Sequence, residues 1–157
     1  CNLARNLGDL LDIKNEMFFQ ETFTYVDSGF DLVLTDMPLC EGAPYLPYQI
    51  INHHFESVKE GGYFIGIIEN DFFEQTGSDI FREEIQKKGY IFGLVKLSET
   101  LFKSSPKSIL ILRRNGDNVK PPKDFLLVDL PSFNDAEAFN NTIKRIDTWI
   151  SSREDEV

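Results

Sequence analysis

Short apolar runs and helical patterns alternate along most of the 157-residue sequence, and this alternation constrains the fold more than any other feature. Strand-like runs are predicted at 30–36, 63–70, 90–97, 108–114 and 125–130, and helices at 2–13, 47–62, 78–89 and 134–150. Strands separated by helices pair in parallel through crossover connections, with helices on both faces of the sheet. The sequence therefore predicts an α/β fold with a mostly parallel sheet.

The segment 90–114 departs from this alternation. Its two strand-like runs are joined by a turn around SSPKS, which is too short for a crossover connection. We expect them to pair as an antiparallel hairpin, so that one strand runs against the others. Residues 1–150 are predicted to form a single α/β domain, and residues 151–157 a frayed acidic tail.

The net charge of −10 is unevenly distributed. Residues 1–80 carry 3 basic and 14 acidic side chains, whereas residues 81–123 carry 10 basic and 4 acidic ones. Phosphate contacts supply much of the affinity for nucleic acids, so an acidic chain is a poor nucleic-acid binder as a whole. Only the basic region 81–123 is a candidate contact surface for DNA, and a solvated face on which charges cluster is the alternative.

Cysteine usage and hydropathy bound the compartment. The two cysteines give no disulfide framework, which is typical of a reducing environment, and no apolar run is long enough to span a membrane. We therefore expect a cytoplasmic protein without a membrane partner. The chain begins at Cys1 without a signal region, and we expect a piece of a longer protein in preference to a lipid-anchored one.

The stretch FDLVLTDMPLC, residues 30–40, places a carboxylate at the end of an apolar strand of the buried type. Pro38 cannot donate to a strand ladder, so the strand ends at Asp36. Ligands of open α/β sheets bind outside the carboxyl ends of the strands. The polar and aromatic groups predicted at this edge, besides Asp36, are Tyr45, Tyr48, Glu69, Asn70, Asp71, Phe102, Lys103, Lys107 and Ser108.

The Asp-x-Pro strand end, the Gly-Gly-apolar strand at 61–70 and the hairpin sequence LFKSSPKSILIL together resemble the later half of a class I S-adenosylmethionine-dependent methyltransferase. The resemblance is greatest to the bacterial adenine-specific DNA methylases, including the modification subunits of type I restriction systems. It covers about residues 1–114. It implies a Rossmann-like methyltransferase sheet, mostly parallel with a terminal antiparallel hairpin, that lacks the first two strands.

The resemblance also implies roles for individual residues. In this family a strand-end Asp-Pro-Pro-aromatic motif holds the target amine, whose two hydrogens are accepted by the carboxylate and a neighbouring backbone carbonyl. Asp36 would be the acceptor, Met37 would supply the carbonyl and Pro38 would turn it outward. Glu21 matches an acidic position that contacts the adenine of the cofactor. The residues that would line the substrate site are Leu39, Tyr45, Tyr48, Asn70, Phe102, Lys103 and Lys107.

Two departures from the family pattern bear on the substrate and the donor. Leu39 stands where relatives have an aromatic residue, and base stacking contributes about 1–3 kcal/mol per base. Phe102, Tyr45 or Tyr48 would have to replace that contact. The chain also contains no G-x-G turn, the element by which relatives hold S-adenosylmethionine. We predict that this chain alone does not bind the donor and that the full-length protein does.

Three functions remain open. The first is the substrate-side part of a methyltransferase acting on a nitrogen, with the exocyclic amine of adenine in DNA as the first candidate. The second is the same fold directed at a protein side-chain amide, and the third is an inactive, methyltransferase-like interaction module. No metal site is expected, because the adjacent His53 and His54 point about 100° apart on a helix.

The missing neighbour of strand 30–36 makes a further prediction. Without the family's first strand, this apolar strand lies at an exposed edge that carries no central lysine or proline to protect it. Residues 16–23, EMFFQETF, are a further strand candidate. We expect either that EMFFQ, residues 16–20, lies beside the edge strand or that a second copy pairs there as a homodimer, and we favour the second copy because the short run covers only part of the edge.

Overall fold

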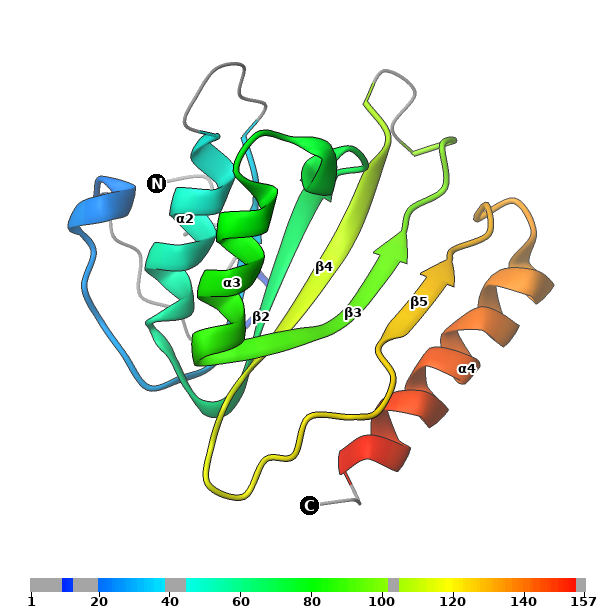
Figure 1. Cartoon of the computed structure of the whole chain (residues 1–157). Helices are drawn as coiled ribbons and strands as arrows, with labels where there is room; N and C mark the ends of the chain where they lie inside the picture. Colours follow the sequence, from blue (N-terminus) through cyan, green and yellow to red (C-terminus); the bar gives the residue numbers. More distant parts are fainter. Residues whose placement is uncertain (1–9, 13–19, 39–44, 102–104, 155–157) are drawn as a thin grey trace.

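The computed structural model describes residues 10–12, 20–38, 45–101 and 105–154 (Figure 1). A five-stranded sheet of order β1-β2-β4-β3-β5 forms their centre. The strands are β1 (Phe30–Asp36), β2 (Val58–Glu69), β3 (Gly89–Lys96), β4 (Lys107–Arg114) and β5 (Leu126–Asp129). β4 is antiparallel to both of its neighbours, and the other strands share one direction. The predicted α/β fold with a mostly parallel sheet and one antiparallel hairpin is confirmed.

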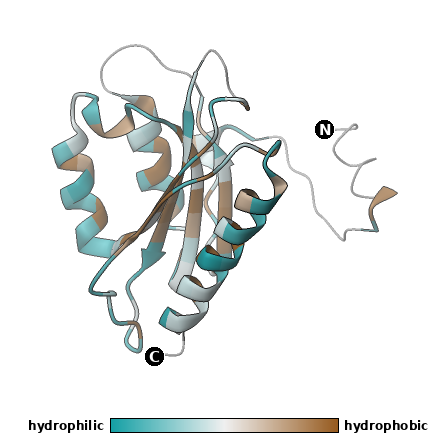
Figure 2. Ribbon diagram, turned by 90° about the vertical axis from the view of Figure 1, so that its right-hand side faces the viewer, coloured by the Kyte–Doolittle hydropathy of each residue, from teal (hydrophilic) through white to brown (hydrophobic). Residues whose placement is uncertain are grey.

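Helices cover the two faces of the sheet unequally. α2 (Leu46–Phe55) and α3 (Ser78–Lys88) pack on one face, and α4 (Ala136–Glu154) lies on the other, beside β3 and β5 (Figures 1 and 2). Two short 3₁₀ helices, η1 (Thr22–Thr24) and η2 (Phe72–Glu74), complete the described elements. α4 continues to Glu154, within the segment predicted as a tail.

The helix predicted at 47–62 is shorter in the structure, because β2 already begins at Val58. Val58 is 3% exposed and pairs with Phe30, and the register then shifts before Leu32 pairs with Tyr63. Gly61 has a φ of +73°, in the left-handed region that favours glycine. The Gly-Gly pair that was interpreted as a helix stop therefore makes an irregularity inside a strand.

Two further predictions need correction. Thr22–Thr24 form η1 and not the end of a strand, whereas residues 13–19 lie outside the described part of the chain. The pattern SDIFREEIQKKG, residues 78–89, predicts a cap at Ser78 and a buried Ile80. Instead, Gly77, with a φ of +92°, occupies the N-cap position of α3, and Ile80 is 64% exposed. Of the helix predicted at 2–13, only residues 10–12 are described.

An aromatic core fills the space between the sheet and the pair α2 and α3. Tyr48 stacks on Phe81 with 4.8 Å between ring centroids, and Phe55 meets Phe64 edge to face. Such offset and T-shaped pairs are the favoured arrangements of aromatic rings. The bulkiest fully buried members are Phe55, Phe64, Phe72 and Phe81 from this core, with Phe92 on the α4 side of the sheet. This aromatic core holds α2 and α3 against the sheet and thereby fixes the positions of the strand ends.

β1 is an edge strand within the described residues, since β2 is its one partner in the sheet. Leu32 is 46% exposed and Leu34 is 67% exposed, so β1 is not the buried strand that its apolar sequence predicts. Periodicity reports how apolar a strand is, but burial also depends on what the rest of the fold places beside it.

Candidate active site

Asp36 is the last residue of β1 and lies level with Ile67 of β2. It is exposed, and it shares the face of the sheet with Leu32 and Leu34, because side chains alternate along a strand. No hydrogen bond or ion pair of this carboxylate is found among the described residues. Asp36 is therefore a carboxylate on a fixed backbone position whose acceptor capacity remains available.

Met37 anchors the turn that follows Asp36. Its backbone N–H donates to the Ile67 carbonyl at 3.0 Å, and its side chain is 4% exposed. Gly66 lies beside it: a Cβ at Gly66 would be 3.7 Å from the Met37 Cε, an ordinary contact, and 3.2 Å from the Phe64 ring, a tight one. Met37 thus replaces a proline with a side chain that packs into the core, while Pro38 stays exposed. Whether the Met37 carbonyl meets a substrate stays a prediction.

β2 continues past the level of Asp36, so the edge of the sheet is stepped. Glu69 lies two residues beyond Ile67, or about 7 Å further along the strand. Its carboxylate pairs with the Lys107 ammonium at 2.8 Å and accepts a hydrogen bond from the Ser105 hydroxyl. The Lys107 and Glu69 side chains are 11% and 18% exposed. Lys107 was predicted to bind substrate, but its charge is already neutralised by Glu69.

Burial alone would raise the pKa of Glu69. The hydrogen bonds from Lys107 and Ser105 and the Lys107 charge outweigh that effect and hold the pKa below its ordinary value of 4.5. The ion pair is therefore formed throughout the neutral range. It ties the end of β2 to the start of β4, and thereby fixes the loop that precedes β4 against the site.

Asn70 follows directly and is held by one contact to Pro106, just before β4, and one to Ser108 within β4. Its backbone N–H donates to the Pro106 carbonyl at 3.0 Å, and its side-chain oxygen accepts from the Ser108 hydroxyl at 2.7 Å. Only its NH₂ group is left to meet a ligand, because no partner of that group is found in the described part of the chain. Asn70 is thus a hydrogen-bond donor in a fixed position, three residues beyond Ile67, the β2 residue that pairs with Asp36. That its NH₂ group contacts a substrate stays a prediction.

Tyr45 and Tyr48 do not stand at the rim, where they were predicted to line the substrate site. They are 7% and 6% exposed and belong to the aromatic core. The Tyr48 hydroxyl donates to the Phe72 carbonyl, and burial raises the pKa of this phenol. Both rings are used in packing α2 against η2 and α3, which is why they cannot stack on a base without leaving the core.

The other predicted site residues are only partly visible. Leu39, Phe102 and Lys103 lie outside the described residues, so their roles stay predictions. Glu21 is exposed and precedes η1, where its backbone carbonyl accepts from the Thr24 N–H at 3.0 Å. The resemblance implies that Glu21 ends a strand, but among the described residues it precedes a 3₁₀ helix. Contact between its carboxylate and a cofactor stays a prediction.

The sequence places Glu69 and Ser108 at this edge but assigns them no role, and it gives no indication of Ser105 or Gly66. The hairpin offered a signal for the role of Glu69, since an acid at the end of one strand and a lysine at the start of its antiparallel neighbour come opposite each other. Ser105 gave no such signal, because it lies before β4 and outside the strand register. Gly66 was visible only as a glycine inside an apolar strand.

The described residues by themselves do not fit S-adenosylmethionine. Relatives hold the donor on a glycine-rich turn after a strand, and no described strand precedes β1. No group of three or more potential ligands for a metal ion is found in the described ranges. Likewise, no described helix is both long and apolar enough to cross a lipid bilayer.

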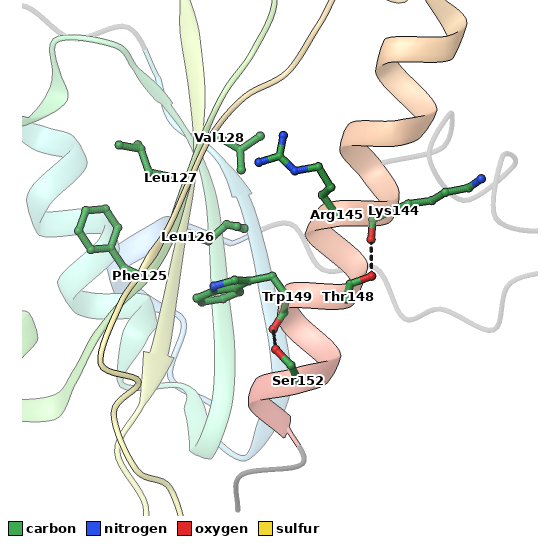
Figure 3. A pocket seen from close by; sticks show the side chains of 9 residues that line it. All are labelled: Phe125, Leu126, Leu127, Val128, Lys144, Arg145, Thr148, Trp149 and Ser152. Carbon is green, nitrogen blue, oxygen red and sulfur yellow. Dashed lines mark hydrogen bonds between the residues drawn. The ribbon is translucent and has the colours of Figure 1, made fainter.

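A cavity of about 590 Å³ lies away from this site, between β5 and α4 (Figure 3). The Trp149 indole lies between Leu126 and the helix, Arg145 points towards Val128, and Lys144 points away. The cavity is separated from β1 by the width of the sheet. It does not contribute to the cluster around Asp36.

Comparisons with known proteins agree with this arrangement. No protein-family model matches the chain. The uncharacterised protein YtxK of Bacillus subtilis is 28% identical over 94% of this chain and 50% of its own length. A provisionally assigned class I S-adenosylmethionine-dependent methyltransferase of Listeria monocytogenes superposes with a TM-score of 0.81 at 27% identity, over 94% of this chain and 51% of its own.

More distant neighbours show the fold alone. The M protein of the type I restriction enzyme EcoKI superposes with a TM-score of 0.53 at 16% identity, covering 69% of this chain and 27% of its own. The chain has part of a class I methyltransferase fold, as its sequence motifs imply. It spans about half the length of YtxK and of the Listeria protein.

Proposed function

We propose that the protein to which this chain belongs is an S-adenosylmethionine-dependent methyltransferase that methylates a nitrogen, with the exocyclic amine of adenine in DNA as its first candidate substrate. The observation that carries the proposal is the exposed Asp36 carboxylate at the end of a strand, which makes no ion pair with the described residues. It lies in a fold shared with class I methyltransferases, at a TM-score of 0.81 to one of them.

The geometry around Asp36 suits a nitrogen acceptor. A carboxylate that makes no contact within the described chain can accept a hydrogen bond from a target amine, and the adjoining backbone offers a second acceptor. Holding both hydrogens leaves the nitrogen lone pair directed at the methyl donor. The fixed position of Met37 supports this role, because orientation of the reacting group supplies much of the rate.

A protein side-chain amide is the second candidate substrate, and one observation favours it. Tyr45 and Tyr48 are in the core, so neither ring of that pair can stack on an extruded base. A third possibility, an inactive interaction module, would retain the fold and lack transfer activity.

DNA contact through residues 81–123 is part of the first candidate. Four of that region's ten basic side chains form ion pairs: Arg82 with Asp79, Lys107 with Glu69, and both Lys88 and Arg114 with Glu56. Five others form no ion pair among the described residues: Lys87, Lys96, Arg113, Lys120 and Lys123. A DNA-binding surface would therefore use these cations, and its affinity should fall as the salt concentration rises.

The test uses the complete protein with Asp36→Asn and, as a matched control, Asp31→Asn on the same strand. Asp31 is exposed and pairs with Lys59, away from the strand end. Transfer of a labelled methyl group to DNA and to protein should fall about 100-fold or more in Asp36→Asn, a typical loss for a group acting on the reacting atoms. Asp31→Asn should keep full activity.

Donor affinity separates a substrate role from a structural one. Asp36→Asn should bind S-adenosylmethionine as tightly as the unchanged protein, since Asp36 faces the acceptor. Full activity of Asp36→Asn, or an equal loss of donor binding, would contradict the proposal. The chain alone should give no saturable heat with S-adenosylmethionine at micromolar concentrations, because it has no glycine-rich turn.

A further inference from the structure

A small cavity of about 170 Å³ lies between β3, β4, the β4–β5 connection and the end of α4, and basic side chains dominate its walls. Its lining residues are Phe92, Arg113, Lys120, Pro121, Pro122, Lys123 and Arg153. Four formal positive charges thus surround a space of small-molecule size, in a chain whose net charge is −10.

Arg113 is the buried member of this group. It is 8% exposed, and its Nε donates to the Gly61 carbonyl at 3.3 Å. Its guanidinium carbon lies 5.1 Å from the Tyr63 ring centroid and 5.8 Å from that of Phe92. None of the ion pairs found among the described residues involves Arg113, Lys120 or Lys123. A buried guanidinium that lacks a carboxylate partner is costly, and an anion would offset that cost.

A turn at residues 116–119, which packs against β2, positions Lys120 and Lys123 at the cavity. Gly116 and Val119 form an isolated bridge at the start of the β4–β5 connection, drawn in yellow at the foot of the sheet in Figure 1. A Cβ at Gly116 would lie 3.3 Å from the Gly61 N, so this turn sits directly on β2. The chain continues through Lys120 to the rigid Pro121-Pro122 pair, which forms one wall of the cavity.

The cavity is distinct from the site around Asp36. Arg113 lies at the end of β4, opposite Tyr63 of β2, whereas Lys107 at the start of β4 lies opposite Glu69. The cavity therefore opens at the amino ends of the parallel strands, and the Asp36 cluster lies at their carboxyl ends. A ligand here would not compete with the substrate of the proposed reaction.

We propose that this basic cavity binds the phosphate group of a small phosphorylated molecule. A planar guanidinium offers paired donors to phosphate oxygens, and the lysine ammonium groups add charge around them. A doubly charged terminal phosphate matches the charges of Arg113, Lys120 and Lys123 better than a monoanionic carboxylate or phosphodiester does. The enclosed space between two proline rings and Phe92 favours a terminal phosphate over the backbone of a duplex.

Pyrophosphate and inorganic phosphate are the probes for the test, titrated into the chain at low ionic strength and followed by calorimetry and by amide chemical shifts. Lys120→Ala with Lys123→Ala should weaken pyrophosphate binding by about tenfold or more, since each lost charge-assisted contact is costly in affinity. Amide shifts should be largest at residues 113, 120–123 and 153. Both lysines are exposed on a connection, so the double variant is expected to fold.

The matched control is Lys87→Ala with Lys144→Ala, which removes the same charge from α3 and from the outward side of α4. It should change pyrophosphate binding less than twofold. Equal weakening in both double variants, or no binding up to about 20 mM pyrophosphate, would overturn the proposal, because the effect would then be net charge alone. Displacement of pyrophosphate by a duplex lacking terminal phosphates would also overturn it and assign the cavity to a DNA contact.

Discussion

The two faces of the sheet differ more than any other two regions of the molecule. On the face covered by α2 and α3, Phe64 is fully buried, and neighbouring aromatic rings surround it. On the other face Leu34 is 67% exposed, and α4 covers only the side of β3 and β5 (Figure 2). The strands are similarly apolar, yet one face of the sheet is covered by packed side chains and the other is exposed to solvent over β1.

The difference shows on which face of the sheet the apolar side chains are buried within the described residues. Val33 and Leu34 are adjacent on β1, yet Val33 packs against the core and Leu34 faces solvent. On the α2 and α3 side, the buried side chains pack against one another within the described residues. The open side carries the groups that can meet something else: Asp36, the edge of β1 and its exposed leucines. Substitutions on the two sides should therefore differ in their effects.

Phe64→Ala should destabilise the chain by about 3–5 kcal/mol, because the change leaves a cavity in the tightly packed face. Leu34→Ala is the matched control on the neighbouring strand and open face, and it should cost less than about 1 kcal/mol. Urea unfolding followed by circular dichroism measures both. Similar costs for the two variants would mean that the open face is covered in solution.

Glu69→Gln should cost about 2 kcal/mol, since it leaves Lys107 buried without its partner at the carboxyl end of the open face. The effect should depend on pH with a definite sign. The pKa of Glu69 is lowered in the folded protein, so its contribution is complete above the ordinary carboxyl pKa of 4.5. That contribution is lost as the pH falls below 4.5 through the lower folded value.

The measurement compares urea unfolding of the two proteins at pH 7 and at pH values below 4.5. The difference in free energy of unfolding between the unchanged chain and Glu69→Gln should shrink on acidification. Thr148→Ala, which removes an exposed hydrogen bond to the Lys144 backbone carbonyl, serves as the control and should show no such trend. A difference that stays constant with pH would mean that the ion pair contributes nothing measurable.

This contrast between faces also marks what sequence reasoning could predict. Element types, the antiparallel hairpin and the position of Asp36 at a strand end followed from periodicity and proline chemistry. Burial did not follow, because Leu34 and Ile80 are apolar residues that no described neighbour covers. The prediction for Tyr45 and Tyr48 was wrong for the opposite reason. Their loop position suggested exposure at the edge of the sheet, but both are buried, and the Tyr48 ring stacks on Phe81.

The predicted end of the helix at 47–62 was wrong for a similar reason, because tertiary contacts override the local helical pattern. The sequence after Phe55 continues a helical pattern, but Val58 finds a buried place beside Phe30 and starts β2 early. Propensity is a weak guide where a residue can gain more by burial. The Glu69 and Lys107 pair was in principle readable, since it follows from strand register once the hairpin is accepted.

Trp149→Ala tests the partly covered region under α4 and should cost about 1–2 kcal/mol, less than a fully buried aromatic residue. Its ring meets Phe92 edge to face at 4.9 Å between centroids, and it is the main aromatic contact of α4 with the sheet among the described residues. Loss of amide protection should be confined to α4 and β5, as measured by hydrogen exchange. Loss of protection across α2 and α3 as well would contradict the separation of the two faces.

Leu34→Lys should have the smallest effect on folding, below about 0.5 kcal/mol, because the side chain is already 67% exposed. Its effect should fall on association. The free edge of β1 and its exposed leucines can pair with a second copy across a twofold axis, so the chain is expected to sediment as a dimer at micromolar concentration. A lysine in the middle of the strand protects such edges, and the variant should be monomeric. Ile80→Lys on α3, where the isoleucine is 64% exposed, places the same charge on the opposite face and should leave the dimer intact. A monomeric unchanged chain with slowly exchanging amides at 32–35 would instead mean that residues of the chain itself close the edge.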